Sequence, residues 1–202
     1  ILEENQSENH IHLGPNFHIV TYPINNTRTS FVAAIKNPKK TEESWKSKGT
    51  YEDLCRDLPE STRYIYESLQ DSNEIYKWGV YTKKIPDKLF DNNITFLGDA
   101  AHPMVPFLGQ GGCMALEDAY IFGKLIKLND SMKTSQIMYQ KLRYKRVKKI
   151  YKDSALQGKL NHISNPFIAY CRNFLMKYML VEALKPNSIW GYDPDVEIKK
   201  IR

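Results

Sequence analysis

Residues 94–112 read Ile-Thr-Phe-Leu-Gly-Asp-Ala-Ala-His-Pro-Met-Val-Pro-Phe-Leu-Gly-Gln-Gly-Gly. The apolar start predicts a short buried strand over 94–97, and Gly98-Asp99 follows it directly. A loop with two prolines comes next, and a glycine cluster then begins a helix predicted over 111–128. A strand, an acidic turn and a helix in this order are typical of α/β proteins, which place ligands at the carboxyl ends of strands.

Two features of this stretch could hold a ligand. The carboxylate of Asp99 could accept hydrogen bonds from hydroxyl groups. The backbone N–H groups around Gly109, Gly111 and Gly112 lie at a helix N-terminus, where the helix dipole favours a negative or electron-rich group. The pair suits a cofactor with a sugar-like chain and an electron-rich ring, and FAD fits that description. The alternatives are a purely local hydrogen bond at Asp99 and glycines that only shape the start of the helix.

The rest of the chain predicts mixed secondary structure. Strands are predicted over 17–23, 30–35 and 76–85, the first two joined by a turn at 25–27. Helices are predicted over 50–57, 60–70, 133–158 and 166–184. The predicted fold class is α/β, or α+β for this piece taken by itself.

Composition and cysteine usage narrow the class of protein. The chain has 202 residues, of which 42% are hydrophobic, as in globular proteins. No apolar run approaches the roughly 18 residues that span a bilayer, so no membrane span is predicted. Cys55, Cys113 and Cys171 show neither a disulfide framework nor metal-ligand spacing, and with no secretory signal they favour the cytoplasm. His10 and His12 are predicted to lie near a mobile end, and no metal site is predicted.

The formal net charge is +6, and much of the excess lies in a basic run over residues 141–152. One interpretation is a surface for nucleic acid, a membrane or an acidic partner. The other is the solvated face of a helix whose buried side carries Leu142, Val147, Ile150 and Tyr151. The pattern favours the second, because the basic residues go nearly all round with no aromatic stacking platform among them.

His18 and Tyr22 belong to the first predicted strand. Side chains at positions i, i+2 and i+4 share a strand face, so His18, Val20 and Tyr22 line one surface. A histidine and a phenol on one face could bind and deprotonate a small phenolic substrate. The residue pattern by itself favours the alternative, a half-exposed strand face.

Three segments together resemble a known family. The central one resembles the second flavin motif of the single-component (class A) FAD-dependent aromatic hydroxylases. The other two resemble a substrate-domain strand and the closing tail of the salicylate hydroxylase and 3-hydroxybenzoate 6-hydroxylase branch. These segments are Gly98-Asp99-Ala100-Ala101-His102-Pro103 with Pro106, Gly109-Gln110-Gly111 and Glu117-Asp118-Ala119; Gly14-Pro15 with His18, Tyr22 and Pro23; and Trp190-Gly191-Tyr192-Asp193-Pro194.

The resemblance implies an oxidoreductase with a p-hydroxybenzoate hydroxylase-like fold. NAD(P)H would reduce FAD, O₂ would react with the reduced flavin, and one oxygen atom would pass to a small phenolic acid-like aromatic substrate. His18 and Tyr22 would be the catalytic residues. A homodimer is compatible with the resemblance; no nucleic-acid partner is expected. The residues implied in FAD binding are Gly98, Asp99, Pro106, Gly109, Gln110, Gly111 and Gly112.

The sequence departs from the family pattern in one respect. It has no Gly-x-Gly-x-x-Gly unit with a later acidic residue for the ribose. We therefore expect the carboxyl-terminal portion of such an enzyme: residues 1–90 as the remainder of the substrate sheet with connecting helices, 91–130 as the second half of the FAD-binding domain, and 131–202 as carboxyl-terminal helices and tail.

Two alternatives to an active enzyme remain open: a truncated remnant that no longer holds FAD, and a basic module for nucleic acid or another partner. Taken alone, the piece is expected to bind FAD weakly or not at all. It is also expected to aggregate, because an incomplete sheet exposes apolar edges.

Overall fold

The computed structural model describes residues 8–36, 44, 46–72, 74–183 and 189–201. These divide into two compact units, and each is described by itself. Unit 1 comprises Ile1–Val80 with Lys159–Arg172, and unit 2 comprises Tyr81–Gly158 with Asn173–Arg202. The predicted division into residues 1–90, 91–130 and 131–202 stays a prediction.

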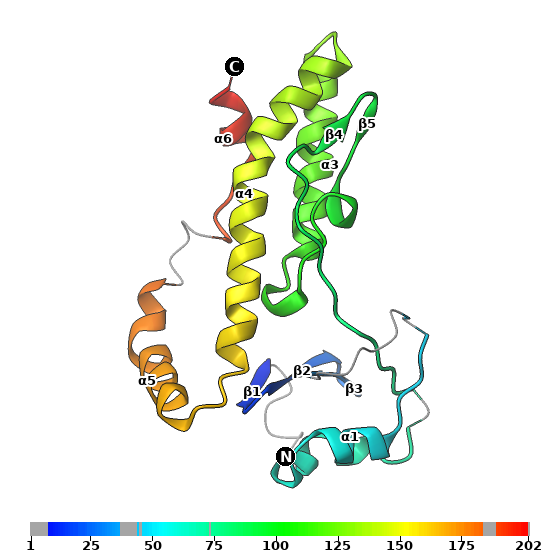
Figure 1. The fold of residues 1–202 in the computed structure, drawn as a ribbon, viewed down its shortest axis with the longest axis vertical. Coiled ribbons are helices and arrows are strands. Elements are labelled where there is room, and N and C mark those ends of the chain that lie inside the picture. Colours follow the sequence, from blue (N-terminus) through cyan, green and yellow to red (C-terminus); the bar gives the residue numbers. More distant parts are fainter. Residues whose placement is uncertain (1–7, 37–43, 45, 73, 184–188, 202) are drawn as a thin grey trace. The chain divides into compact units, whose positions relative to one another are not determined.

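Unit 1 is built on a three-stranded antiparallel sheet in the order β1-β2-β3, formed by β1 (His10–Gly14), β2 (Phe17–Asn25) and β3 (Arg28–Ile35) (Figure 1). The β2–β3 hairpin confirms the two predicted strands and their turn. His10 and His12, predicted to lie near a mobile end, both belong to β1. The β1–β2 turn contains Asn16 in a left-handed conformation with φ 64°, which asparagine tolerates better than most residues.

Helical segments of unit 1 pack beside this sheet. Helix α1 (Tyr51–Asp57) begins with a capping box of Thr50 and Asp53, and confirms the helix predicted there. The helix predicted over 60–70 is broken into a 3₁₀ turn (Glu60–Thr62), α2 (Arg63–Tyr66) and a second 3₁₀ turn (Glu67–Leu69). The core of the unit consists of Phe17, Ile19, Leu58 and Tyr66.

The strand predicted over 76–85 is wrong. Tyr76 forms an isolated bridge with Lys48, supported by backbone hydrogen bonds from Gly49 N to Ile75 O and from Lys77 N to Ser47 O. In the part of the chain that the structure describes, residues 77–85 belong to no strand. Alternation of apolar residues is not enough to make a strand where no neighbouring strand supplies hydrogen bonds.

Unit 2 is mainly helical. A short hairpin of β4 (Phe90–Asp91) and β5 (Ile94–Thr95) leads through 3₁₀ turns at Gly98–Ala100 and Pro106–Leu108 into α3 (Gly111–Leu128). The strand predicted over 94–97 is thus shorter than expected, while the helix over 111–128 is confirmed. Helices α4 (Met132–Asn161) and α5 (Pro166–Ala183) confirm two more predictions, with Leu184 outside the described residues, and α6 (Pro194–Lys199) was not predicted.

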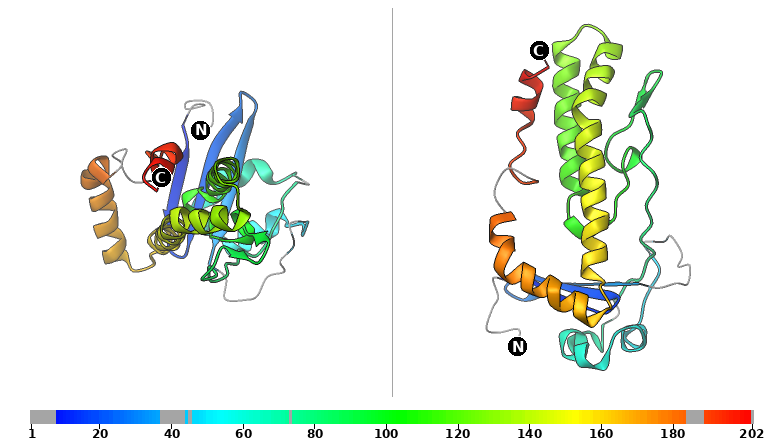
Figure 2. Two further views of the ribbon diagram at one scale, coloured as in Figure 1. Left: turned by 90° about the horizontal axis from the view of Figure 1, so that it is seen from above. Right: turned by 60° about the vertical axis from the view of Figure 1, so that its left-hand side comes forward.

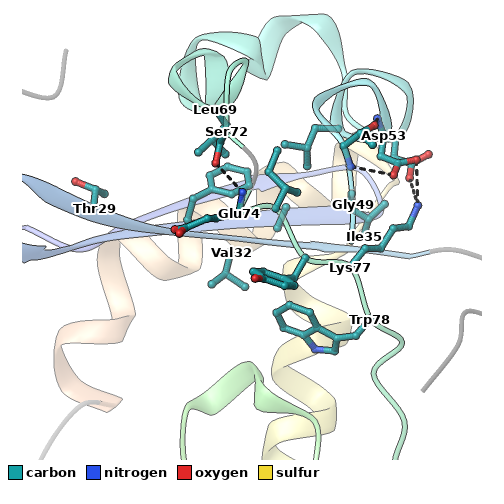
Figure 3. Close-up of a pocket in the computed structure, with 17 residues that line it drawn as sticks. Thr29, Val32, Ile35, Gly49, Asp53, Leu69, Ser72, Glu74, Lys77 and Trp78 are labelled. Carbon is teal, nitrogen blue, oxygen red and sulfur yellow. Dashed lines mark hydrogen bonds and ion pairs between the residues drawn. The ribbon is translucent and has the colours of Figure 1, made fainter. Parts of the chain in front are cut away.

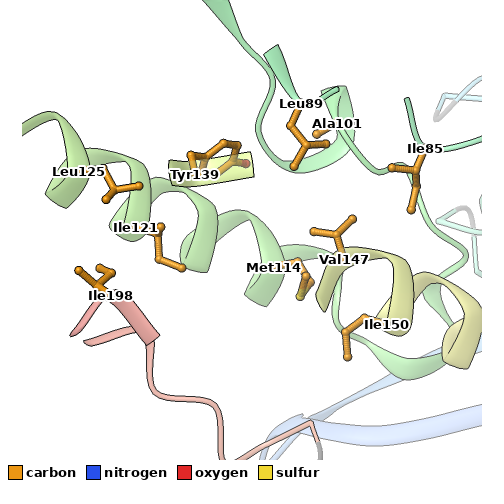
Figure 4. Packing of buried hydrophobic residues seen from close by; sticks show 10 residues of the cluster. All are labelled: Ile85, Leu89, Ala101, Met114, Ile121, Leu125, Tyr139, Val147, Ile150 and Ile198. Atoms are coloured by element: carbon orange, nitrogen blue, oxygen red, sulfur yellow. The ribbon is translucent and has the colours of Figure 1, made fainter. Parts of the chain in front are cut away.

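Helix α3 and the unit 2 part of α4 run side by side in every view (Figures 1 and 2). Their facing sides bury Met114, Ile121 and Leu125 against Tyr139 and Val147, and Ile198 of α6 joins the same cluster (Figure 4). The core positions on α4 recur at helical spacing, which places Arg143 on the same face as Tyr139 and Val147. The described strands are all antiparallel and separate from the helices, as the α+β prediction for this piece requires.

Candidate functional site

The loop between β5 and α3 begins at Gly98, whose backbone is left-handed with φ 54°. A Cβ at this position would lie 3.0 Å from the Cβ of Ala115, so glycine is required both by conformation and by packing. Gly98 N–H donates to Oδ2 of Asp118 at 2.9 Å, and Nε2 of His102 lies 2.6 Å from the same oxygen. One buried carboxylate on α3 therefore holds two points of the loop.

The charge of Asp118 is balanced by arginine. Arg143 Nε donates to Oδ1 of Asp118 at 2.7 Å and its NH1 donates to Glu117 at 2.6 Å, while Arg146 binds the same glutamate. Asp118, His102 and Arg143 are fully buried. Burial alone would raise the pKa of Asp118, but hydrogen bonds from His102, the charge of Arg143 and the Gly98 N–H outweigh it and hold that pKa below its ordinary value. Asp118 stays ionised and acts as the fixed anchor of the loop.

The remainder of the loop is fixed by hydrogen bonds to two backbone carbonyl groups and by packing of the Phe107 ring. Thr82 Oγ1 donates to Pro103 O at 2.7 Å, and Ser154 Oγ donates to Val105 O at 2.5 Å. The Phe107 ring lies against Gly158 of α4 so closely that a Cβ there would be 2.2 Å from it. The structure therefore sets the backbone course of the loop before any ligand arrives.

Among the predicted FAD-binding residues, Gly98 is buried with its N–H bonded to Asp118, and Gln110 is buried, whereas the others remain accessible. Asp99 is exposed, and among the described residues its carboxylate makes no hydrogen bond or ion pair. Around Gly109, Gly111 and Gly112 a Cβ would meet no atom within 4 Å. Gln110 makes no side-chain capping bond to the first amides of α3, and Pro106 is exposed at the start of its 3₁₀ turn.

Two buried side-chain nitrogens in this loop also lack a hydrogen-bond partner among the described residues: Nδ1 of His102 and Nε2 of Gln110. The Gln110 amide is a donor and could bind an acceptor on a ligand, whereas Nδ1 of a neutral His102 whose Nε2–H bonds Asp118 is an acceptor. These residues fit a flavin: a carboxylate for hydroxyl groups, and amide donors at a helix N-terminus for a carbonyl-rich ring edge.

The predicted catalytic residues, His18 and Tyr22, lie on β2 in unit 1. His18 is buried, with its Nδ1 2.7 Å from Nε2 of His162, whereas Tyr22 is 41% exposed. Burial, and then the neighbouring His162 ring, lower the pKa of His18 to about 4. His18 is therefore a neutral imidazole at physiological pH.

Unit 1 also has a cavity of about 430 Å³ at the edge of β3 (Figure 3). Val32 and Ile35 of β3, Leu69, and the aromatic side chain of Trp78 contribute to its walls, and Lys77 lies 3.1 Å from Asp57 at its rim. Neither His18 nor Tyr22 lines it. The cavity is thus separate from the predicted catalytic face of β2.

Comparison with known proteins places the chain in a family. Residues 3–151 match the FAD binding domain family, and the chain belongs to that family. It is 29% identical over 153 residues to the 3-amino-4-hydroxybenzoate 2-monooxygenase PtnB3 of Streptomyces platensis, covering 75% of this chain and 39% of that protein. It is also 29% identical to the 3-hydroxybenzoate 6-hydroxylase 2 of Aquipseudomonas alcaligenes, covering 88% and 51%.

Solved structures share the fold. A salicylate hydroxylase in a substrate complex aligns with TM-score 0.74 at 21% identity, over 95% of this chain and 48% of that one. Klebsiella pneumoniae HpxO, complexed with FAD and uric acid, aligns with TM-score 0.69 at 19% identity, over 87% and 46%. The chain spans about half the length of these proteins or less.

These findings confirm the resemblance to class A FAD-dependent aromatic hydroxylases, the fold class, and FAD as the cofactor of the family. The assignment of individual site residues stays a prediction. No helix in the described ranges has both the length and the apolar composition to cross a membrane.

Sequence reasoning missed two groups of the site. Glu117 and Asp118 entered the sequence analysis only as part of the flavin motif, without a partner; they are the seventh and eighth residues of α3 and both bind Arg143. The position of Arg143, midway between Tyr139 and Val147 on an apolar helix face, could have indicated a buried arginine that needs a carboxylate partner. His162 offered no signal, because it lies 144 residues from His18 and follows the end of a helix.

Proposed function

We propose that this chain is the carboxyl-terminal part of a flavin-dependent monooxygenase that hydroxylates a small phenolic acid with NAD(P)H and O₂. The observation that carries the proposal is the loop over 98–112. Its backbone is fastened by Asp118, Thr82 and Ser154, while the groups suited to a flavin remain unpaired in the described chain. Such preorganisation is what binding a cofactor in one orientation requires.

When bound, FAD would supply the oxygen-transfer chemistry. Asp99 would accept hydrogen bonds from the hydroxyl groups of its sugar-like chain. The amides at Gly111 and Gly112 would donate to the ring edge, where the α3 dipole stabilises negative charge. In unit 1, the neutral His18 would accept the phenol proton of the substrate, and Tyr22 would contact the substrate from the same strand face.

The substrate class is supported by the names of the relatives. Those reported above act on an amino-hydroxybenzoate and a hydroxybenzoate, and one aligned structure is a salicylate hydroxylase. All of these substrates carry a hydroxyl group on a benzoate ring. A phenolic acid is therefore the class to test first.

Flavin titration of the 202-residue chain tests the cofactor site. Because no Gly-x-Gly-x-x-Gly unit is present to hold the ADP half, riboflavin and FAD should bind with similar, weak affinity. Gly112→Val should weaken both about tenfold or more by covering the amides. Gly123→Val is the matched control, since it lies in the same helix in equally open space.

Absence of saturable flavin binding up to millimolar concentration would favour the remnant, and equal binding by both valine variants would contradict the cofactor site. Oxidation of NADH or NADPH that a hydroxybenzoate stimulates would support the enzyme over a remnant. The basic-module alternative predicts salt-sensitive retention on DNA instead. Arg143 and Arg146 already bind carboxylates within unit 2, which leaves fewer of the basic residues for such a surface.

A further inference from the structure

The segment over 189–201 packs on the helices of unit 2, to which it belongs. Ile198 is buried in the core of that unit (Figure 4), and Tyr192 packs against the same core. Asp195 forms an ion pair with Lys124 of α3 at 2.5 Å. The segment is therefore held to the rest of unit 2 by an apolar contact and by a charged one.

Tyr192 lies over two arginines of α4. The centroid of its ring is 3.7 Å from Cζ of Arg146 and 5.7 Å from Cζ of Arg143. Arg146 also donates to Ile189 O at 3.3 Å, so a ring and a backbone carbonyl of the same segment meet one guanidinium group. A guanidinium group over an aromatic face is attracted by the ring, and the attraction grows as water is excluded.

The buried arginine connects Tyr192 with the loop over 98–112. Arg143 binds Glu117 and Oδ1 of Asp118. Oδ2 of Asp118 accepts a hydrogen bond from the N–H of Gly98, where the loop begins. Water that reached Arg143 would weaken its ion pair with Asp118, because the attraction between charges falls as the local dielectric constant rises. The ring of Tyr192 therefore protects the ion pair on which the start of the loop depends.

We propose that Tyr192 is a positioning residue for the flavin site and acts through Arg143 and Arg146. Its ring shields the two guanidinium groups, keeps Asp118 in place, and so holds the loop in the conformation that leaves its amides open. The inference rests on the proposed function, in which those amides bind the flavin ring edge. The ring face carries the effect, since the buried Tyr192 hydroxyl group has no hydrogen-bond partner among the described residues.

Amide hydrogen exchange followed by NMR on the 202-residue chain, without flavin, tests the connection. The measured quantity is the exchange rate of Gly98 relative to that of Ile121, a buried residue of α3. Tyr192→Leu should raise this ratio about tenfold, because the hydrogen bond of Gly98 loosens while α3 keeps its own hydrogen bonds. Tyr192→Phe keeps the ring and should keep the parent ratio.

A control variant separates positioning from a general loss of stability. Leu125→Ala removes a fully buried side chain from the same core without touching the arginines, and it should not raise the ratio. The same ratio in Tyr192→Leu as in the parent, or an equal increase in Leu125→Ala, would overturn the inference.

Riboflavin titration gives a second readout. Tyr192→Leu should weaken riboflavin binding about tenfold, whereas Tyr192→Phe should not. Asp195→Asn changes the contact of the same segment with Lys124, away from the arginines, and should leave the affinity unchanged. Equal affinity of the parent and Tyr192→Leu would overturn the role of Tyr192 and leave the cofactor site intact. If the parent binds no flavin, the proposed function fails for this chain, and the Gly98 exchange ratio still decides whether Tyr192 holds the loop.

Discussion

The candidate site of unit 2 is stabilised by buried charged side chains, whereas that of unit 1 consists of neutral imidazole rings. The loop over 98–112 is hydrogen-bonded to Asp118, which forms an ion pair with Arg143. Arg143 also pairs with Glu117, so each charge in this network has an opposite partner. The β2 site depends on His18 and His162, whose ring nitrogens lie 2.7 Å apart and whose pKa values are both lowered by burial, which favours neutral rings. A cofactor site benefits from a permanent field, while a proton-accepting site benefits from groups that can still change charge. The two regions should therefore respond differently to mutation and to pH.

Removing the anchor of unit 2 should have the largest effect. Asp118→Ala leaves Arg143 buried without one of its two carboxylate partners and frees Gly98 and His102. Breaking a buried ion pair in this way costs about 3–5 kcal/mol. Urea denaturation measures the loss. Asp130→Ala, at an exposed position after α3, should change stability by no more than about 0.5 kcal/mol. Equal stability of both variants would show that the network does not hold the loop.

Acid should affect unit 1 first. The folded pKa of His18 is about 4, below the ordinary 6.5, so the unfolded chain takes up the proton at higher pH. The contribution of His18 is complete above about pH 6.5 and is lost as the pH falls toward 4. The shift from 6.5 to about 4 corresponds to about 3.5 kcal/mol at roughly 1.4 kcal/mol per pKa unit.

The Asp118 contribution is also lost on acidification, but at lower pH. Its folded pKa is depressed, so that contribution persists above the ordinary carboxylate pKa and is lost only at still lower pH. Hydrogen exchange at pH 5 should therefore show faster opening of β2 and β3 than of α3. His18→Asn should flatten the pH dependence of stability between 6.5 and 4. Loss of α3 protection before that of β2 would contradict the comparison.

Gly158→Ala should displace the Phe107 ring and so disturb the loop over 98–112. The new Cβ would lie 2.2 Å from the Phe107 ring, so the ring must leave its place against α4. Overpacking of this kind costs about 1–3 kcal/mol. The flavin affinity of the proposed site should fall with it, since Phe107 directly precedes the stretch of open amides. Gly123 has open space around it, so Gly123→Ala should reduce neither the stability nor the flavin affinity.

Local sequence patterns predicted the elements that make their own hydrogen bonds. Helix α3 has the predicted bounds, and the turn at 25–27 correctly joined β2 to β3. The strand expected over 76–85 failed because a strand needs a partner that the local sequence does not specify. The glycines and Asp99 could be identified as ligand groups from residue type. Asp118 and His162 could not, because their roles depend on contacts with residues distant in the sequence.

The smallest expected effect concerns α1, which begins with a full capping box. Thr50 accepts from Asp53 N at 3.2 Å, and Asp53 accepts from Thr50 N at the same distance. Thr50→Ala should cost about 1 kcal/mol of unfolding free energy. Because α1 lies with β2 and β3 in unit 1, hydrogen exchange should accelerate in α1 and leave α3 protected. Equal acceleration in α3 would mean that the two units unfold as one. The buried charges of unit 2 and the neutral imidazoles of unit 1 would then not give the units different stabilities.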